Sequence, residues 1–318
     1  MSASSLIASP IRSIGPAPAL GIAMRRGIAF GLVAALIWGS YMAISNHGIE
    51  AGLRPADLAF IRYAVAGLLL LPWLARHVPL HLGGIGWRKG LTLSLFAGPL
   101  FVLVGTSGYR FAPLAHGAVI QLGALTVASV LLASALIGER AGRHRLAGLS
   151  VIIAGLGVTA GPSLFAGGST AWIGDLLFVA AGIMWALFTV LQRRWAIDPM
   201  AATAVVSVVS AAIYVPLYLS SQGLTRIAAT NSAMLAEQIL VQGVLSGVIA
   251  MFAFSRAVQD LGAGRAALFP TLAPAIAILA GIPLGGGVPT VFQAVGLLIL
   301  SIGMLIAVIG SPLAFRKI

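Results

Sequence analysis

Apolar stretches dominate this sequence, and they constrain its fold more than any other feature. Ten of them are long enough for a transmembrane helix, at about residues 28-46, 58-75, 90-110, 114-137, 145-161, 172-192, 200-219, 236-257, 264-284 and 289-310. A helix crosses about 30 Å of hydrocarbon with about 20 residues, because each residue rises about 1.5 Å. With 59% hydrophobic and 8% charged residues, the chain has too little polar surface for a soluble globule. We therefore expect an all-α integral membrane protein with ten transmembrane helices.

Positive charge is distributed unevenly between the loops. If the N-terminus lies in the cytoplasm, fifteen of the 19 Lys and Arg residues fall on that side, and Arg54, Arg62, Arg110 and Arg226 fall outside. Cytoplasmic loops of membrane proteins carry an excess of Lys and Arg. The count therefore predicts ten spans with both termini in the cytoplasm. The basic residues do not gather in one domain, so the net charge of +12 does not indicate a nucleic-acid partner.

The supply of metal ligands and proton carriers is small. The chain has no cysteine, which excludes disulfides and thiolate metal sites. Its seven Asp and Glu residues fall in predicted loops or at helix ends. We expect no carboxylate at mid-membrane to carry a proton or a sodium ion, and therefore no tight ion coupling. The sequence predicts no metal site and no cofactor.

The second half of the chain repeats the first. Three features recur at nearly one offset: Trp38 with Trp185, 147 apart; Gly148 and Gly155 with Gly296 and Gly303, 148 apart; and Arg110 with Arg256, 146 apart. We divide the chain into a disordered leader (1-27), a first five-helix repeat (28-161), a second five-helix repeat (172-310) and a cytoplasmic tail (311-318). The seven-residue glycine spacings predict close packing of the fifth and tenth spans.

The number of spans in each repeat determines how the repeats are related. Five is odd, so the two repeats must be inserted in opposite directions, about a two-fold axis in the membrane plane. Inverted repeats of this kind are typical of secondary transporters, whose substrate site lies near the midplane between the repeats. We expect a site there, with alternating access by rocking of one repeat against the other.

Aromatic and polar side chains share one face of each span that carries the repeated tryptophan. By helical spacing the two faces hold Trp38, Tyr41 and Ser45 in the first span, and Trp185, Phe188, Thr189 and Gln192 in the sixth. Both tryptophans lie well inside their spans, where the indole N–H needs an internal partner or a water-filled cavity. The two faces either line a central cavity or pack against neighbouring helices. We name Trp38, Tyr41, Trp185 and Thr189 as candidate substrate-binding residues.

Further polar side chains lie inside the apolar stretches. Gln121 is in the fourth stretch, and Gln238, Gln242 and Ser246 form an i, i+4, i+8 stripe in the eighth. They must point into the bundle, because lipid cannot satisfy their hydrogen-bonding groups. They contact either a substrate or one another, and Tyr109 either lines the cavity mouth or anchors its helix at the interface. Tyr109, Gln121 and Gln242 complete the candidate substrate-binding residues.

Four short motifs resemble the drug/metabolite transporter superfamily, in its ten-span EamA-type branch. They are Leu36-Ile37-Trp38-Gly39-Ser40, Asp57-Leu58-Ala59-Phe60-Ile61-Arg62-Tyr63, Gly138-Glu139-Arg140 and Leu272-Ala273-Pro274, and the resemblance covers about residues 28 to 310. The chain departs from the family pattern at Thr126, where the family has Pro. It departs again at Gly286-Gly287, where the family has Gly-Glu, which argues against a charge-based gate at that end.

The resemblance implies a multi-pass protein of the bacterial inner membrane that exports small metabolites. With aromatic midplane faces and no buried charge, the chain is similar to bacterial aromatic amino-acid exporters. The leading hypothesis is a non-enzymatic exporter of aromatic and other neutral amino acids, acting by alternating access. Its partners are a small-molecule substrate and the lipid bilayer, and it is a monomer or a weak oligomer. The alternatives are a permease for other amphipathic metabolites or drugs and, more remotely, an integral-membrane enzyme, which would need clustered His and carboxylates.

Overall fold

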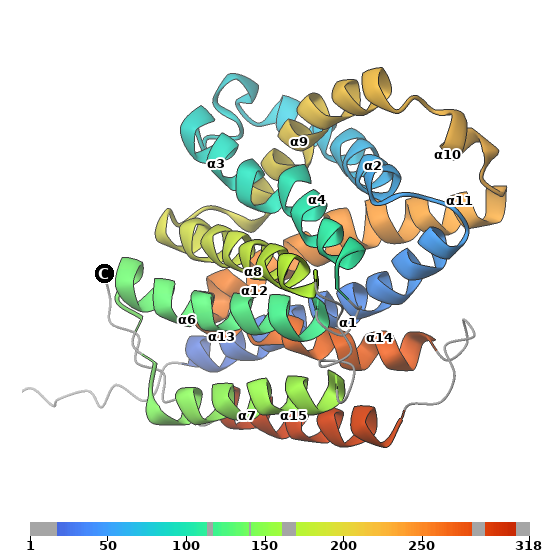
Figure 1. Ribbon diagram of the computed structural model, residues 1–318. Coiled ribbons are helices and arrows are strands. Elements are labelled where there is room, and N and C mark those ends of the chain that lie inside the picture. The colour runs from blue at the N-terminus through green and yellow to red at the C-terminus, as the bar shows by residue number, and fades with distance from the viewer. Residues whose placement is uncertain (1–17, 113–116, 140, 161–169, 282–289, 310–318) are drawn as a thin grey trace, which may run out of the picture.

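Helices make up all of the regular structure that is described. The computed structural model describes residues 18-112, 117-139, 141-160, 170-281 and 290-309, and within them no strand occurs. Most helices lie across the view of Figure 1, stacked from α7 and α15 at the bottom to α2 and α9 at the top. The all-helical prediction is confirmed for this part of the chain.

The elements follow one another with short connections. In chain order they are α1 (Pro18–Glu50), α2 (Pro55–Arg76), η1 (Pro79–His81), α3 (Trp87–Ala97), α4 (Pro99–Ser107), η2 (Gly108–Arg110), η3 (Gly117–Gln121), α6 (Leu122–Ile137), α7 (Arg143–Ala160), α8 (Ala171–Arg194), α9 (Pro199–Ser221), α10 (Thr225–Ala229), α11 (Ser232–Gln238), η5 (Ile239–Ala250), α12 (Met251–Leu261), α13 (Ala263–Ala266), η6 (Phe269–Leu272), α14 (Ala273–Gly281) and α15 (Val291–Ile309). Of these, η3 and η5 are π-helical.

Each of the ten predicted stretches contains one or more helices. Six helical segments are long and apolar enough to cross a membrane: Gly21–Ile49, Pro55–Arg76, Trp87–Ser107, Ala171–Arg194, Pro199–Ser221 and Ser232–Leu261. The remaining four stretches carry shorter helices, so the ten-span topology stays a prediction. The first helix begins at Pro18, so residues 18-27 of the predicted leader are helical.

Proline and capping residues determine several helix boundaries. Pro55, Pro99 and Pro199 begin α2, α4 and α9, where the first turn has no use for the N–H that proline lacks. Asp198 caps α9, because its Oδ1 accepts hydrogen bonds from the backbone N–H groups of Met200 and Ala201 at 2.9 and 3.0 Å. Gly98 and Pro99 separate α3 from α4 within the predicted stretch 90-110.

The ninth predicted span is interrupted as well. Pro270 lies in the 3-10 element η6, between α13 and α14, whereas Pro283 lies outside the described residues.

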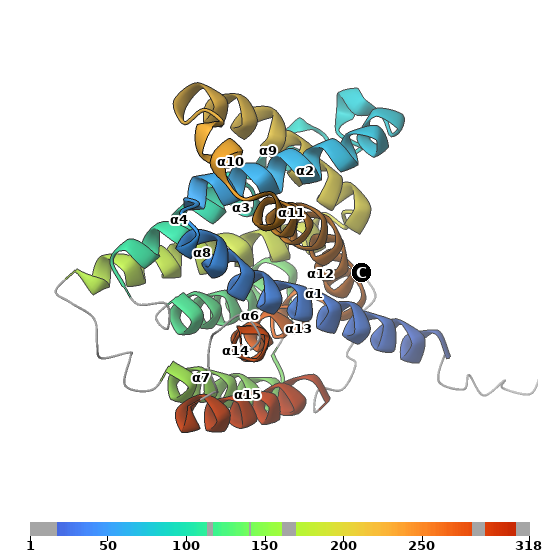
Figure 2. The ribbon, with the colours of Figure 1, turned by 90° about the vertical axis from the view of Figure 1, so that its right-hand side faces the viewer.

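The fifth helices of the two repeats pack tightly and antiparallel. A Cβ on Gly148 would lie 2.5 Å from the backbone nitrogen of Ala307, and one on Gly155 would lie 2.7 Å from that of Leu300. Gly148 approaches Gly303, which is the repeat equivalent of Gly155. Gly155 in turn approaches Gly296, which is the repeat equivalent of Gly148. Such reciprocal contacts arise only about a two-fold axis. The close packing predicted for these helices is present, and Figures 1 and 2 both show α7 beside α15.

Contacts elsewhere come in equivalent pairs. The first helix of each repeat packs on the fourth of the other, α1 on α14 and α8 on α6. The third helix of each repeat packs on the first and second helices of the other repeat. In the first repeat, α4 packs on α8 and α3 packs on α9; in the second repeat, α12 packs on α1 and η5 packs on α2. The second helices, α2 and α9, contact each other. This is the pattern that a two-fold relation between the repeats produces.

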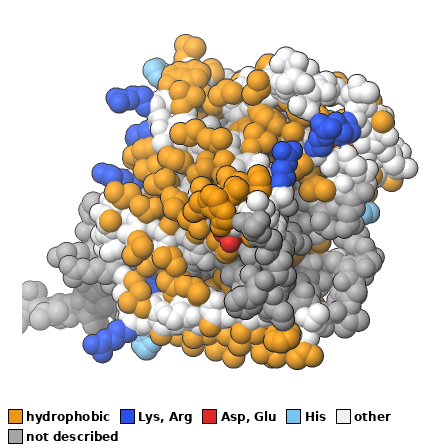
Figure 3. All heavy atoms as spheres, in the orientation of Figure 1, with side chains coloured by type: hydrophobic (Ala, Val, Ile, Leu, Met, Phe, Trp, Pro, Cys, Tyr) orange, Lys and Arg blue, Asp and Glu red, His pale blue; other side chains and the backbone are white. Residues whose placement is uncertain are grey.

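The outer surface of the bundle is apolar over a broad area. Leu68, Leu131 and Leu298, on three different helices, are all more than 60% exposed. In the view of Figure 3, hydrophobic side chains cover most of the described surface, and Lys and Arg gather towards its left and upper right edges. Apolar patches of this extent are typical of a surface that lies against lipid.

Candidate functional site

The two repeated tryptophans meet in the middle of the bundle. The rings of Trp38 on α1 and Trp185 on α8 are 5.2 Å apart at 86°, a T-shaped contact. Phe254 on α12 lies 5.2 Å from Trp38 and 5.8 Å from Trp185. Phe101 and Phe188 lie 4.8 and 5.2 Å from Trp185. We call these five residues the aromatic cluster.

The aromatic cluster joins helices of both repeats. Trp185 is 5% exposed and Phe188 and Phe254 are fully buried, while Trp38 is half-buried. The two predicted faces therefore contact each other directly in this conformation. Their contact is compatible with packing and with a cavity that closes around the tryptophans, so the substrate contact of this pair stays a prediction.

A second group of side chains lies between α1, α2 and η5. We call it the polar cluster: Tyr41, Ser45, Arg62, Gln238, Gln242 and Ser246. The Nη1 of Arg62 donates to the Oγ of Ser246 at 2.8 Å. Gln242 Nε2 donates to Ser45 Oγ at 2.8 Å and to Gln238 Oε1 at 3.1 Å. The bonds of Arg62 to Ser246 and of Gln242 to Ser45 join residues that lie far apart in the sequence.

Arg62 corrects the sequence interpretation. It was counted among the outer-loop cations, and the chain was taken to have no buried charge, yet Arg62 lies within α2 and is 6% exposed. The rings of Tyr41 and Tyr63 lie 5.7 and 5.8 Å from its Cζ. The signal was in the sequence, because Arg62 falls inside the predicted stretch 58-75, and an ionisable residue within a span indicates a functional site by default.

Asp57 is buried at the start of the same helix and has other partners. Its Oδ1 accepts a hydrogen bond from Tyr218 Oη at 2.6 Å, and its Oδ2 lies 3.1 Å from Arg226 Nε. Oδ2 also accepts from the backbone N–H of Arg54 at 2.7 Å. The carboxylate thus connects α2 to α9 and α10.

The other predicted site residues are dispersed. Thr189 is buried and its hydroxyl donates to the carbonyl of Trp185 at 2.8 Å, within its own helix. Gln121 ends η3 and lies beside Gly105 of α4, where an added Cβ would be 3.3 Å from Gln121 Oε1. Tyr109 lies in η2, and its side chain is outside the described part of the chain. The structure thus brings Trp38 to Trp185, and Tyr41 to the same cluster as Gln242.

The end predicted to face the cytoplasm is connected by charged groups. Glu139 accepts hydrogen bonds from the backbone N–H groups of Ala263 and Gly264 at 3.2 and 3.3 Å, and Arg193 Nε lies 3.9 Å from it. Arg26 and Asp260 form a two-bond pair, with both distances 2.8 Å. Each of these contacts joins one repeat to the other.

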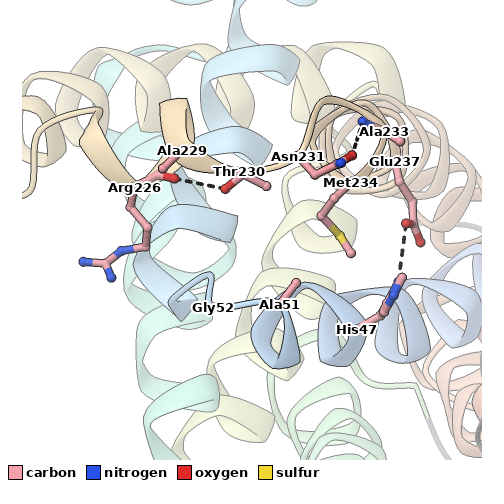
Figure 4. A pocket seen from close by; sticks show the side chains of 10 residues that line it. All are labelled: His47, Ala51, Gly52, Arg226, Ala229, Thr230, Asn231, Ala233, Met234 and Glu237. Carbon is pink, nitrogen blue, oxygen red and sulfur yellow. Dashed lines mark hydrogen bonds and ion pairs between the residues drawn. The ribbon is translucent and has the colours of Figure 1, made fainter.

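A pocket of about 480 Å³ lies at the opposite end of α1. Figure 4 shows it between the end of α1, with His47 and Ala51, and the segment from Arg226 to Glu237. His47 Nδ1 lies 3.4 Å from Glu237 Oε2 across one side. Met234 lines the pocket, and its sulfur accepts from Gln238 Nε2 at 3.6 Å. The pocket therefore lies one helical turn from the polar cluster.

Comparison with known families decides the broad identity. The model of the EamA-like transporter family matches residues 25–161 and again residues 172–309. The chain belongs to the EamA-like transporter family. The two matches confirm the duplication that the recurring tryptophan predicted, and they make the chain a membrane transporter of small solutes.

A solved crystal structure shows the same fold as this EamA-like transporter. It is 19% identical, covers 88% of this chain and 96% of its own, and superposes with a TM-score of 0.72. No curated protein matches the chain. In this chain the aromatic cluster holds residues from both matched ranges.

Proposed function

We propose that this EamA-like transporter exports amino acids, preferably aromatic and other neutral ones, across a bacterial inner membrane. The observation that carries the proposal is the contact of Trp38 with Trp185 at the junction of the repeats. Inverted-repeat transporters bind their substrate near this junction. We propose further that the chain has ten spans, with both termini in the cytoplasm.

The aromatic cluster supplies the contact for the substrate side chain. Aromatic rings attract one another in T-shaped and offset geometries, at centroid distances of about 4.5–7 Å. When the repeats separate, Trp38 and Trp185 lose their mutual contact, and an aromatic or aliphatic side chain takes its place. Phe254 and Phe101, which already contact the tryptophans, then form the walls on either side.

Contacts between the repeats supply the two gates for alternating access. At the cytoplasmic end, Glu139 bonds to Ala263 and Gly264, and Arg26 to Asp260. At the other end the charges come from residues other than the Glu that Gly287 replaces: Asp57 pairs with Arg226, and His47 with Glu237. Rocking of one repeat against the other breaks one set of contacts while it keeps the other. The pairs with an exposed partner, Arg26 with Asp260 and His47 with Glu237, are individually weak and can open at low cost. Asp57 is buried, so its pair with Arg226 costs more to break.

Ion coupling has little support in the described residues. Asp57 is the buried carboxylate closest to the polar cluster in sequence, and it is held by Tyr218 and Arg226. Proton carriers in transporters are ionisable residues within the spans, whereas Asp57 lies in the first turn of α2. We therefore propose transport without tight coupling to a proton gradient.

Purified protein in liposomes tests the proposal. Labelled phenylalanine, tyrosine, leucine, uracil and glucose are each assayed with and without a pH gradient, against empty liposomes. We expect the two aromatic amino acids to equilibrate fastest and the gradient to have little effect. If neither aromatic amino acid moves faster than in empty liposomes, the substrate proposal is wrong. Accumulation driven by a proton gradient would overturn the argument on coupling.

A permease for other amphipathic metabolites or drugs is the second candidate. The pocket lined by Met234 favours it, because methionine adapts to ligands of varied shape. Faster transport of lipophilic amines than of amino acids in the same liposomes would select this candidate.

A further inference from the structure

Arg62 is a buried cation whose hydrogen bonding is incomplete. It is 6% exposed, and its bond to Ser246 Oγ uses only Nη1. Its Nε is buried and has no hydrogen-bond partner among the described residues. Burial of a guanidinium inside a membrane span is unfavourable unless an anion and further acceptors compensate it.

No described carboxylate compensates this charge. The ion pairs found within the described residues do not include Arg62. Asp57, five residues earlier in α2, is taken by Tyr218 and Arg226. The rings of Tyr41 and Tyr63 attract the guanidinium, but a ring face is a weaker partner than a carboxylate.

An unsatisfied acceptor belongs to the same cluster. Gln242 uses its Nε2 twice, towards Ser45 and Gln238, while its Oε1 is buried without a partner among the described residues. Gln242 lies one helical turn before Ser246, the residue that Arg62 contacts. A buried donor and a buried acceptor, both unsatisfied, thus belong to neighbouring residues of one cluster.

We propose that Arg62 binds the carboxylate of the substrate and that Gln242 Oε1 accepts a hydrogen bond from its ammonium group. This assignment rests on the proposed function and names the groups that recognise the amino-acid head. A guanidinium fits a carboxylate with two parallel hydrogen bonds, which a lysine cannot reproduce. The carboxylate of a zwitterionic substrate then contacts Arg62, and its ammonium group contacts Gln242 Oε1.

The polar cluster lies where the head group of a substrate can bind while its side chain contacts the aromatic cluster. Tyr41 follows Trp38 by three residues, so the two side chains share one face of α1 about one turn apart. A ligand whose head contacts Arg62 beside Tyr41 can therefore place its side chain against Trp38 and Trp185. The head and the side chain of one amino acid span the two clusters.

Competition measurements on purified full-length protein test the head-group assignment. Phenylalanine, phenethylamine, which lacks the carboxylate, and 3-phenylpropionate, which lacks the ammonium group, each compete against labelled phenylalanine. In the wild type we expect phenylalanine to compete about tenfold to a hundredfold better than phenethylamine, the range of one charge-assisted hydrogen-bond pair. In Arg62→Gln that ratio should fall to about one. Gln242→Leu should instead remove the preference for phenylalanine over 3-phenylpropionate.

Arg76→Gln is the matched control, because Arg76 is an exposed arginine on the same helix. It should keep the wild-type ratio. If Arg62→Gln keeps it too, or if phenethylamine competes as well as phenylalanine in the wild type, the assignment is overturned. Should Arg62→Gln fail to fold, Arg62→Lys decides: a reduced ratio supports the assignment, and an unchanged ratio overturns it.

A binding assay separates this inference from the proposed function. Sodium benzoate should raise the unfolding temperature of the wild type in detergent and not that of Arg62→Gln or Arg62→Lys, while benzyl alcohol should not distinguish the three. If benzoate stabilises in this way but no amino acid is transported, the proposed function fails and the carboxylate site stands. If benzoate has the same effect on all three proteins, the carboxylate site fails.

Discussion

The polar cluster and its repeat equivalent have the same backbone setting but different side-chain chemistry. The polar cluster lies between α1, α2 and η5, and its counterpart lies between α8, α9 and the pair α3 and α4. Where the first has Tyr41, Ser45, Arg62, Gln238, Gln242 and Ser246, the second has Phe188, Gln192, Val206, Thr92, Phe96 and Leu100. One arginine-centred group thus faces a largely apolar one across the two-fold axis.

The offsets between the helices support this equivalence. Tyr41 and Phe188 are 147 apart, as Trp38 and Trp185 are. Arg62 and Val206 are 144 apart, as are the prolines that begin α2 and α9, Pro55 and Pro199, and those inside the same helices, Pro72 and Pro216. Gln242 and Phe96 are 146 apart, as Arg256 and Arg110 are.

The two repeats therefore keep equivalent helix contacts, while the side chains at equivalent positions differ in polarity. Phe188 and Val206 are 0% and 2% exposed in a continuous apolar core. A two-fold axis in the membrane plane would put the two clusters in opposite halves of the membrane, so the charged head of a substrate has a partner on one side only.

Placing an arginine at Val206, the repeat equivalent of Arg62, should have the largest effect on stability. Val206→Arg buries a guanidinium in a group that holds no carboxylate, which should lower the free energy of unfolding by about 3–5 kcal/mol. Unfolding temperature in detergent and the monodisperse fraction on size exclusion measure it. Val206→Leu keeps the position apolar but adds a methylene to a packed core, and it should cost about 1–3 kcal/mol. Equal stability of the two variants would show that the two clusters do not differ in polarity.

Removing Trp185 should test whether the aromatic cluster, where the two repeats meet, contacts the substrate. Its ring contacts Trp38, Phe101, Phe188 and Phe254. Trp185→Ala removes the ring that the proposal places against the substrate, so transport should slow by about tenfold to a hundredfold, which corresponds to about 1.4–2.8 kcal/mol. Initial rates in liposomes, normalised to folded protein, measure the change. Trp172→Ala, at a 61% exposed position, should transport normally. Unchanged transport in Trp185→Ala would assign this tryptophan to packing alone.

The glycine contact should separate stability from transport. Gly155→Ala places a methyl group 2.7 Å from the backbone nitrogen of Leu300, which should lower the free energy of unfolding by about 1–3 kcal/mol. The transport rate per folded molecule should stay the same, because α7 and α15 lie outside both clusters. Gly157→Ala meets no atom within 4 Å and should be neutral or slightly stabilising. Equal stability of the two alanine variants would contradict the close packing.

Removing the Ser246 hydroxyl should have the smallest effect. Ser246→Ala deletes the hydrogen bond to Arg62 Nη1, so apparent substrate affinity should fall by about twofold to tenfold. Competition binding with labelled phenylalanine measures it. Ser301→Ala removes an exposed hydroxyl that bonds only to its own helix and should leave affinity unchanged. An affinity in Ser246→Ala equal to that of the wild type would show that Ser246 does not orient Arg62.

Helix positions were largely predictable, and the site was predictable only in part. Long apolar stretches bounded by Gly, Pro and charge locate helices locally, and the break at Gly98-Pro99 follows from the missing N–H of Pro99. The pairing of Trp38 with Trp185 followed from the repeat. The partners of Arg62 did not, because Ser246 lies 184 residues away, and no local pattern reports which helices become neighbours.

The sequence by itself determined an all-helical, duplicated chain whose glycines pack the fifth helices together, because hydrophobicity, proline and glycine act over a few residues. Only the tertiary structure decided that Arg62 is buried with no carboxylate partner among the described residues, and that Glu139 joins the repeats by accepting from Ala263 and Gly264. These contacts depend on how whole helices cross. The charge balance of a buried group is therefore a property of the packed bundle and not of the segment that carries it.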